Sequence, residues 1–149
     1  MSVLRLTRTF AAPRERVFAA WTEPEVLRTW WAARHGWATS AVAVDLRPGG
    51  SYRLSMRDPL ADDEYTVSGE YLEVAPPERL RYTWTWEGEA EIMRGSEATV
   101  VTVDFVADGE TTEVTVTHEG FADDRIAGLH REGWTACLDN LERALAPVG

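Results

Sequence analysis

Alternating apolar and polar residues predict β-strands along most of this chain. In LRLTRTF, residues 4–10, three of the four positions on one face are leucine or phenylalanine, whereas the other face holds arginine and threonine. A period of two residues is typical of a strand with one buried face. Further segments with this pattern are 41–46, 51–57, 65–74, 79–86, 98–106 and 111–120.

Two short helices are predicted after the first strand. AAPRERVFAAW, residues 11–21, places Pro13 at a first helical position and spaces its apolar residues for one helix face. In TEPE, Thr22 precedes Glu25 by three residues, which is the spacing of a capping box at a helix N-terminus. The apolar side of this second helix is formed by Val26, Leu27, Trp30 and Trp31.

The longest periodic segment runs from Asp123 to Leu145 and predicts one amphipathic helix. At about 100° per residue, its apolar residues fall within an arc of roughly 140°, with charged residues opposite. His130 lies near the middle of this arc, and Gly133 follows it, although a glycine inside a helix costs about 1 kcal/mol relative to alanine. The arc consists of Ile126, His130, Gly133, Trp134, Cys137, Leu138, Leu141, Ala144 and Leu145.

The order of these elements predicts an α+β fold. A strand, two short helices, about six further strands and a long helix indicate one antiparallel sheet with the last helix laid over it. The pair Asp108-Gly109 between two of the strands is a strong hairpin signal. A chain of 149 residues has the size of one globular domain, so we expect residues 1–149 to form a single domain.

The amino-acid composition limits the classes of binding partner and the cellular compartment that we expect for this chain. The formal net charge of -10 disfavours binding to nucleic acid and to anionic membranes. The chain has no long apolar run and no N-terminal signal pattern, and its one cysteine, Cys137, cannot form an internal disulfide. We therefore expect a cytoplasmic protein. The acidic stretches 58–64 and 87–97 are interpreted as solvated loops, with a pocket rim or a partner-docking surface as the alternative.

Two histidines are the candidate polar groups of an interior site. His118 continues the alternation of Val114 and Val116, so its side chain should project to the same side as these valines. Together with His130 it could transfer protons or orient a ligand. A buried histidine is also commonly held by a hydrogen bond to a backbone carbonyl or a tyrosine, without any further role. Both interpretations stay open from the sequence.

An aromatic stripe runs along the strand predicted at 79–86, and tryptophans of the helices are expected to converge on it. Most such side chains form core. An aromatic wall with a few polar groups is also typical of a pocket for a flat apolar ligand. The residues expected to line such a pocket are His118, His130, Gly133, Trp134, Tyr82, Trp84, Trp86, Trp30, Trp31 and Met56.

The sequence contains no recognisable catalytic nucleophile or metal site. It has no Gly-x-Ser-x-Gly elbow, and PGGSY, residues 48–52, lacks the ending of a phosphate-binding loop. THEGF, residues 117–121, lacks the second histidine of the zinc-protease motif, and catalytic zinc needs three protein ligands. We therefore expect no catalytic residue, no metal and no cofactor.

Several stretches in a fixed order resemble one known family. The sequence is similar to the START-like, or SRPBCC, superfamily with the helix-grip fold, and within it to single-domain proteins related to the C-terminal domain of the heat-shock-protein-ninety ATPase activator. The stretches that carry the resemblance are RTFAAPRERVFAAWTEPEVLRTWW, LRPGGSYRL, GEYLEVAPPERLRYTW, THEGF and HREGWTACLDNLERAL. The resemblance implies a curved, seven-stranded sheet that grips the C-terminal helix, with a cavity between them.

The resemblance also suggests a role for the glycine in the last helix. If this helix forms a cavity wall, Gly133 leaves room for a ligand on its inner face, and His130 can point a ring nitrogen into the cavity. Alternatively, Gly133 allows a strand or a short helix to approach closely. The two readings have equal weight.

Three functions are compatible with these patterns. We prefer the binding of a hydrophobic or aromatic small molecule in the cavity. The second function is an enzyme of cyclase, dehydratase or hydrolase type, in which His118 and His130 carry protons. The third, which the resemblance alone implies, is modulation of a chaperone ATPase through a protein interaction. A monomer and a homodimer are both compatible with the sequence.

Overall fold

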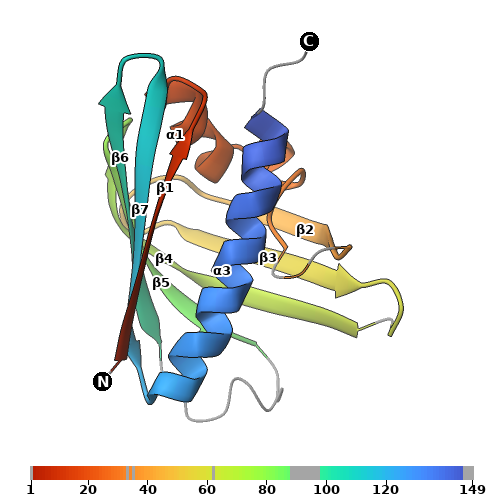
Figure 1. Cartoon of the computed structure of the whole chain (residues 1–149). Coiled ribbons are helices and arrows are strands. Elements are labelled where there is room, and N and C mark those ends of the chain that lie inside the picture. Colours follow the sequence, from red (N-terminus) through yellow and green to blue (C-terminus); the bar gives the residue numbers. More distant parts are fainter. Residues whose placement is uncertain (1, 33, 35, 62, 88–97, 146–149) are drawn as a thin grey trace.

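A computed structural model of the 149-residue chain describes residues 2–32, 34, 36–61, 63–87 and 98–145. A first strand is followed by two short helices, six further strands and a long helix (Figure 1). The elements are β1 (Ser2–Phe10), α1 (Arg14–Thr22), α2 (Pro24–Leu27), β2 (Ala38–Val44), β3 (Ser51–Asp58), β4 (Asp63–Ala75), β5 (Arg79–Trp86), β6 (Thr99–Asp108), β7 (Thr111–Phe121) and α3 (Asp124–Leu145).

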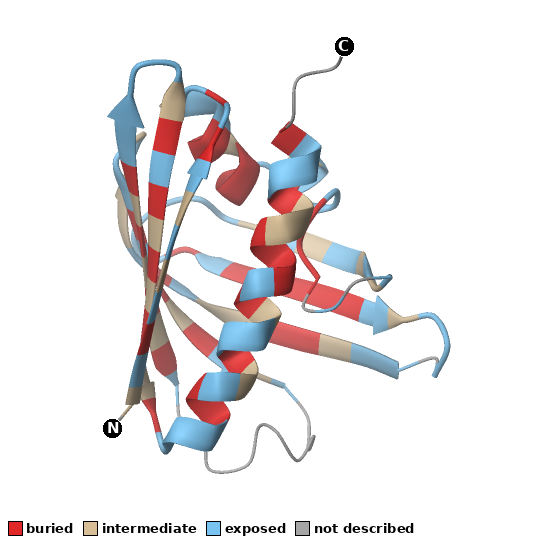
Figure 2. Cartoon of the chain, viewed as in Figure 1, coloured by how far each residue is buried: buried red, intermediate tan, exposed pale blue. Residues whose placement is uncertain are grey.

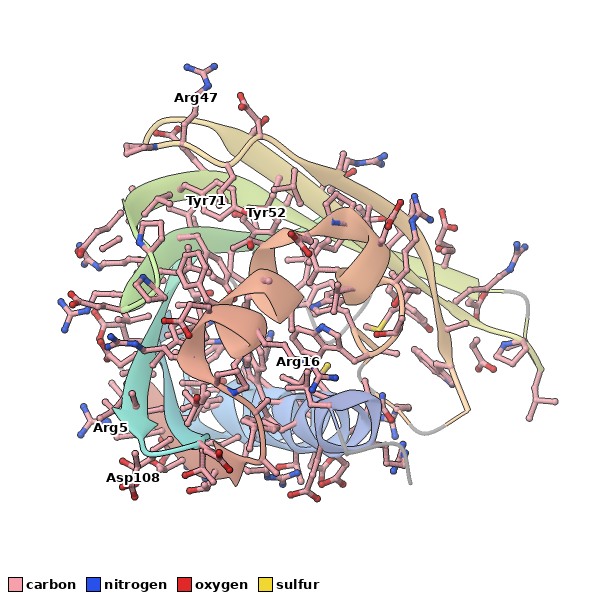
Figure 3. The ribbon with its side chains drawn as sticks, turned by 90° about the horizontal axis from the view of Figure 1, so that it is seen from above. Arg5, Arg16, Arg47, Tyr52, Tyr71 and Asp108 are labelled. Carbon is pink, nitrogen blue, oxygen red and sulfur yellow. The ribbon has the colours of Figure 1, made fainter. Side chains whose placement is uncertain are left out.

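The strands form one antiparallel sheet with the order β1-β7-β6-β5-β4-β3-β2. The first strand pairs with the last, so β1 and β2 are the two edges. The sheet is strongly curved, and α3 crosses its concave side, with α1 and α2 near one end (Figures 1 and 3). The predicted α+β helix-grip architecture is thereby confirmed.

Period-two alternation sets which side chains face the interior (Figure 2). In β5, Leu80, Tyr82 and Trp84 are buried, whereas Arg81 and Thr85 on the opposite face are exposed. His118 in β7 is completely buried, as the alternation with the neighbouring valines predicts. The β6–β7 hairpin also forms where it was expected, with Gly109 at a φ of 63° that favours glycine.

The long helix begins where Asp123 caps it, because the Asp123 carboxylate accepts the backbone N–H of Ile126 at 2.9 Å. Its buried residues largely follow the predicted arc. Four positions differ: Ala144 is exposed and Gly133 half-buried, whereas Ala127 and Ala136, outside the arc, are buried. No helix in the described part of the chain is long and apolar enough to cross a membrane.

The predicted capping box at Thr22 and Glu25 is wrong. Thr22 is still the last residue of α1, and its hydroxyl donates to the carbonyl oxygen of Phe18 at 3.2 Å. Glu23 precedes α2 without a side-chain cap, and Pro24 occupies the first turn. The first helix continues one residue into the motif, so the hydroxyl is used within α1. Similarly, Pro13 precedes α1 and is not its first residue.

Of the two acidic stretches, 58–64 is described except for Asp62 and forms the β3–β4 turn with the adjoining strand ends, and Leu60 at the turn is 97% exposed. The stretch 87–97 lies outside the described residues except for Glu87. The carboxylate of Glu87 accepts two hydrogen bonds from Arg53, at 2.9 and 3.0 Å.

An ion pair joins the edge strand β1 to the long helix, because Arg8 donates to the carboxylate of Asp139. Both side chains are partly shielded from solvent. We expect Arg8→Met to lower the free energy of unfolding by about 0.5–1 kcal/mol at low salt, and by less at high salt. Urea unfolding at two NaCl concentrations measures this difference. Arg47→Met is the matched control, because the Arg47–Asp45 pair is exposed and joins no two elements. Equal losses for both variants would contradict the prediction.

Candidate functional site

His118 is held in the interior by hydrogen bonds at both ring nitrogens. The indole N–H of Trp134, which can only donate, points at Nδ1 of His118 at 3.1 Å. Nε2 therefore carries the proton and donates to the Thr99 hydroxyl at 2.6 Å. That hydroxyl in turn donates to the carbonyl oxygen of Trp84 at 3.2 Å. The chain of hydrogen bonds links α3, β7, β6 and β5, and every group in it has a partner.

His130 in α3 has the opposite tautomer. Its Nδ1–H donates to the backbone carbonyl of Ile126 at 2.9 Å, and its Nε2 accepts the indole N–H of Trp86 at 2.8 Å. The two imidazole rings lie 5.3 Å apart, centre to centre. Each imidazole is thus the acceptor for one tryptophan on the opposite layer of the fold.

Burial keeps both imidazoles neutral. Desolvation lowers the pKa of His118 well below its usual value, and a charge on His130 would lower it further. Desolvation also lowers the pKa of His130, partly offset by the hydrogen bond to Ile126. Proton transfer at either ring would break a hydrogen bond that the interior cannot replace. The geometry therefore favours a structural role for the pair and gives no support to their use as proton carriers.

A pocket of about 1110 Å³ lies beside α3, between this helix, the segment before β2, and strands β3, β4 and β5. We call it the aromatic pocket, because six of its lining side chains are tryptophan or tyrosine. Trp31, Trp84 and Trp134 are buried, whereas Trp37, Tyr65 and Trp86 are half-buried. The lining residues are Trp31, Arg34, Trp37, Met56, Tyr65, Trp84, Trp86, Arg125, Leu129, His130, Arg131, Glu132, Gly133, Trp134, Thr135, Ala136, Cys137 and Asp139.

The rings of the aromatic pocket form two groups. Trp84 is the centre of the first, with ring centroids 5.5 Å from both Trp86 and Trp134 and 6.3 Å from Trp31. The second is a parallel stack of Trp37 on Tyr65, with centroids 5.3 Å apart and planes inclined by 7°. Offset and edge-on packing of this kind fixes ring orientation. The wall of the pocket is therefore largely preformed.

Seven of the ten predicted site residues line the aromatic pocket: Trp31, Met56, Trp84, Trp86, His130, Gly133 and Trp134. His118 does not line this pocket; it is fully buried, with its ring nitrogens hydrogen-bonded to Trp134 and Thr99. Trp30 does not either, since it turns into the core, where its indole N–H donates to Ala20 and its ring packs on Trp21. Gly133 is half-buried on the pocket wall, where it contributes no side chain.

Tyr82 also lies away from the aromatic pocket, in a cluster with two other tyrosines. Its ring lies 5.2 Å from Tyr52 and 6.0 Å from Tyr71, around a cavity of about 20 Å³. Figure 3 shows Tyr52 and Tyr71 pointing inward, whereas Arg5 and Arg47 point away from the molecule. Burial raises the pKa of Tyr71 to about 12, so its hydroxyl is protonated at neutral pH. This space is far too small for an organic ligand.

Sequence reasoning missed several residues of the pocket. Arg34 and Trp37 belong to the irregular segment before β2, where no periodicity assigns a direction. Tyr65 lies near the start of β4, and its alternation with Val67 could have indicated that both share one face. Arg125 and Leu129 lie on the flank of α3, outside the apolar arc.

The aromatic pocket offers neither a metal site nor an activated thiol. In the described part of the chain, no three histidine, cysteine or carboxylate side chains gather at a distance that could hold a metal ion. Cys137 lines the pocket, but burial raises the pKa of its thiol to about 12, and its Sγ–H donates to Ala32. The pocket offers apolar ring faces bordered by charged side chains.

Comparison with known proteins identifies relatives over nearly the whole chain. A family profile with the description "Activator of Hsp90 ATPase homolog 1-like protein" matches residues 11–146. No curated protein matches the chain.

Solved structures with the same fold come from several bacteria. The chain is 26% identical to a protein from Chromobacterium violaceum, with a TM-score of 0.85 over 99% of this chain and 100% of that one. It is 28% identical to the AHSA1 protein from Silicibacter pomeroyi, with a TM-score of 0.83 over 97% of each chain. It is 31% identical to an uncharacterized protein from Rhizobium leguminosarum, with a TM-score of 0.78 over 97% and 93% of the two chains.

Proposed function

The chain belongs to the family of Activator of Hsp90 ATPase homolog 1-like proteins, and from this fold and the aromatic pocket we propose that it binds a small hydrophobic molecule with an aromatic body. The observation that carries the proposal is the pocket itself, about 1110 Å³ with a wall of tryptophan and tyrosine rings. Ligand pockets of proteins commonly have volumes of 300–1,000 Å³ and apolar, aromatic linings.

The arrangement of hydrogen bonds supports binding over catalysis. The indole N–H groups of Trp86 and Trp134 are satisfied by His130 and His118, so these two tryptophans present mainly apolar surface. The flat ring faces of these two tryptophans favour a ligand that is itself flat and apolar. Seven of the residues assigned to the site from the sequence take part in this proposal, as the pocket wall on which the ligand rests.

A neutral fluorescent probe tests the proposal. We expect N-phenyl-1-naphthylamine to bind and, at ten times its dissociation constant, to stabilise the fold by about 1.4 kcal/mol, because only the folded state has the pocket. Gly133→Leu should weaken binding about tenfold, since the new side chain stands on the pocket wall. Probe fluorescence and thermal unfolding with and without the probe measure both effects.

Gly128→Leu is the matched control for this experiment. Gly128 lies in the same helix, does not line the pocket, and has open space around an added Cβ. Both substitutions raise helix propensity, so a general effect on α3 should appear in both variants. If the probe does not bind, or if the two variants bind it equally well, the pocket is not the binding site that we propose.

The family description favours a second candidate function, stimulation of the Hsp90 ATPase. It predicts that the purified protein raises the ATP hydrolysis rate of this chaperone at micromolar concentration. The assay separates the two functions, because Gly133→Leu should weaken probe binding about tenfold without changing a stimulation that depends on an outer surface. An unchanged hydrolysis rate would rule out the chaperone role.

A further inference from the structure

The aromatic pocket reverses the charge balance of the chain. Acidic residues outnumber basic ones by 25 to 15 in the whole sequence. Among the residues that the structure describes, the lining of the pocket contains three arginines, Arg34, Arg125 and Arg131, and two acidic residues, Glu132 and Asp139. Asp139 is engaged by Arg8 from the neighbouring edge strand. Within the described lining, the arginines are therefore opposed mainly by Glu132, whereas the whole sequence is strongly anionic.

One of these arginines adjoins the aromatic wall directly, and a second lies on the flank of α3 that lines the pocket. The Arg34 guanidinium lies 5.9 Å from the centre of the Trp37 ring, which is stacked on Tyr65. Arg125 shares one flank of α3 with Leu129 and Ala136, four and eleven positions later, and all three line the pocket. A ring bound against the tryptophans therefore has guanidinium groups within the same pocket.

We propose that the natural ligand class is an amphipathic organic anion, namely an aromatic carboxylate or sulfonate. This inference rests on the proposed function, and adds to it the charge of the ligand. The aromatic body lies against the tryptophan rings, and the anionic group is held by a guanidinium group of the pocket lining, that of Arg34 or that of Arg125. Guanidinium forks bind carboxylates and similar oxyanions with paired, charge-assisted hydrogen bonds, whereas an uncharged ligand gains nothing from them.

Two probes with the same ring system test the charge. 8-Anilinonaphthalene-1-sulfonate carries a sulfonate that N-phenyl-1-naphthylamine lacks. We expect the sulfonate probe to bind at least about fivefold more tightly, and raising NaCl to about 0.5 M should remove most of this preference. Fluorescence titration of the full chain gives both dissociation constants under each condition.

Substitutions assign the effect to named residues. The double variant Arg34→Gln/Arg125→Gln should lose about fivefold or more in affinity for the sulfonate probe and less than about twofold for the neutral one. Glu132→Gln should act in the opposite direction, because it removes the negative charge of the wall. Arg81→Gln is the control: Arg81 is exposed on the outer face of β5 and does not line the pocket.

The possible outcomes separate the two proposals. If both probes bind with equal affinity, and the double variant does not change this, the proposed preference for an anionic ligand is refuted. The proposal that the pocket binds an aromatic molecule would then still stand. An equal loss in Arg81→Gln would also refute it, because general surface charge would then be the cause. If neither probe binds, the proposed function itself fails. A selective loss of the sulfonate probe in the pocket variants alone would support the inference.

Discussion

Replacing His118 by leucine is expected to lower the free energy of unfolding by about 2–4 kcal/mol. Among the described residues, the substitution removes the one hydrogen-bond partner of the Trp134 indole N–H, and a buried donor without a partner costs about 1–3 kcal/mol. It also removes the hydrogen bond to Thr99, worth about 0.5–1.5 kcal/mol. Because leucine fills nearly the same volume as histidine, most of the lost stability should come from the missing hydrogen bonds. Urea unfolding monitored by tryptophan fluorescence measures it.

A double-mutant cycle distinguishes this cause from a simple packing defect. Trp134→Phe removes the indole N–H, so in that background no donor is left without a partner when His118 is replaced. We expect His118→Leu to be less destabilising there by about 1–2 kcal/mol. An equal loss in both backgrounds would show that the hydrogen bond between the two rings contributes nothing, and that His118 acts through packing alone.

Periodicity predicted the features that depend on a single strand or helix, namely which side chains face the interior. The inward direction of His118 follows from its alternation with Val114 and Val116 within one strand, and the burial of Trp134 follows from its place on a helical arc. Local patterns cannot say which partner each group finds across two layers. The pairing of His118 with Trp134, and of His130 with Trp86, depends on how α3 is positioned along the strands of the sheet.

The two adjacent tryptophans Trp30 and Trp31 also show that a local sequence pattern does not decide which side chain lines the pocket. Trp30 and Trp31 follow a helix of only four residues, Pro24–Leu27, so no regular period assigns them a direction. The structure turns Trp30 into the core beside Trp21 and places Trp31 on the pocket wall. Composition and spacing identified the set of aromatic residues, but their division between core and pocket depends on packing.

Acidification is expected to destabilise the protein before its carboxylates titrate. Both buried imidazoles have pKa values below the usual 6.5, so between pH 6.5 and these lower values the unfolded chain binds more protons than the folded one. Stability is therefore complete above pH 6.5 and falls as the pH decreases, by about 1.4 kcal/mol per pH unit for each histidine that stays neutral in the fold. We expect a progressive loss of stability between pH 6.5 and 5, with a larger contribution from His118 than from His130, measured by urea unfolding.

His130→Gln provides the comparison for this prediction, because a glutamine oxygen can still accept the Trp86 N–H but does not titrate. This variant should lose distinctly less stability over the same pH range than the parent protein. The imidazole resonances of His118, followed by NMR, should keep the position of a neutral ring at pH 6, where an exposed histidine is mostly protonated, and those of His130 should titrate below pH 6.5. Rings that titrate near pH 6.5 would mean that water reaches them, and the two hydrogen-bonded pairs of imidazole and indole would then not exist in solution.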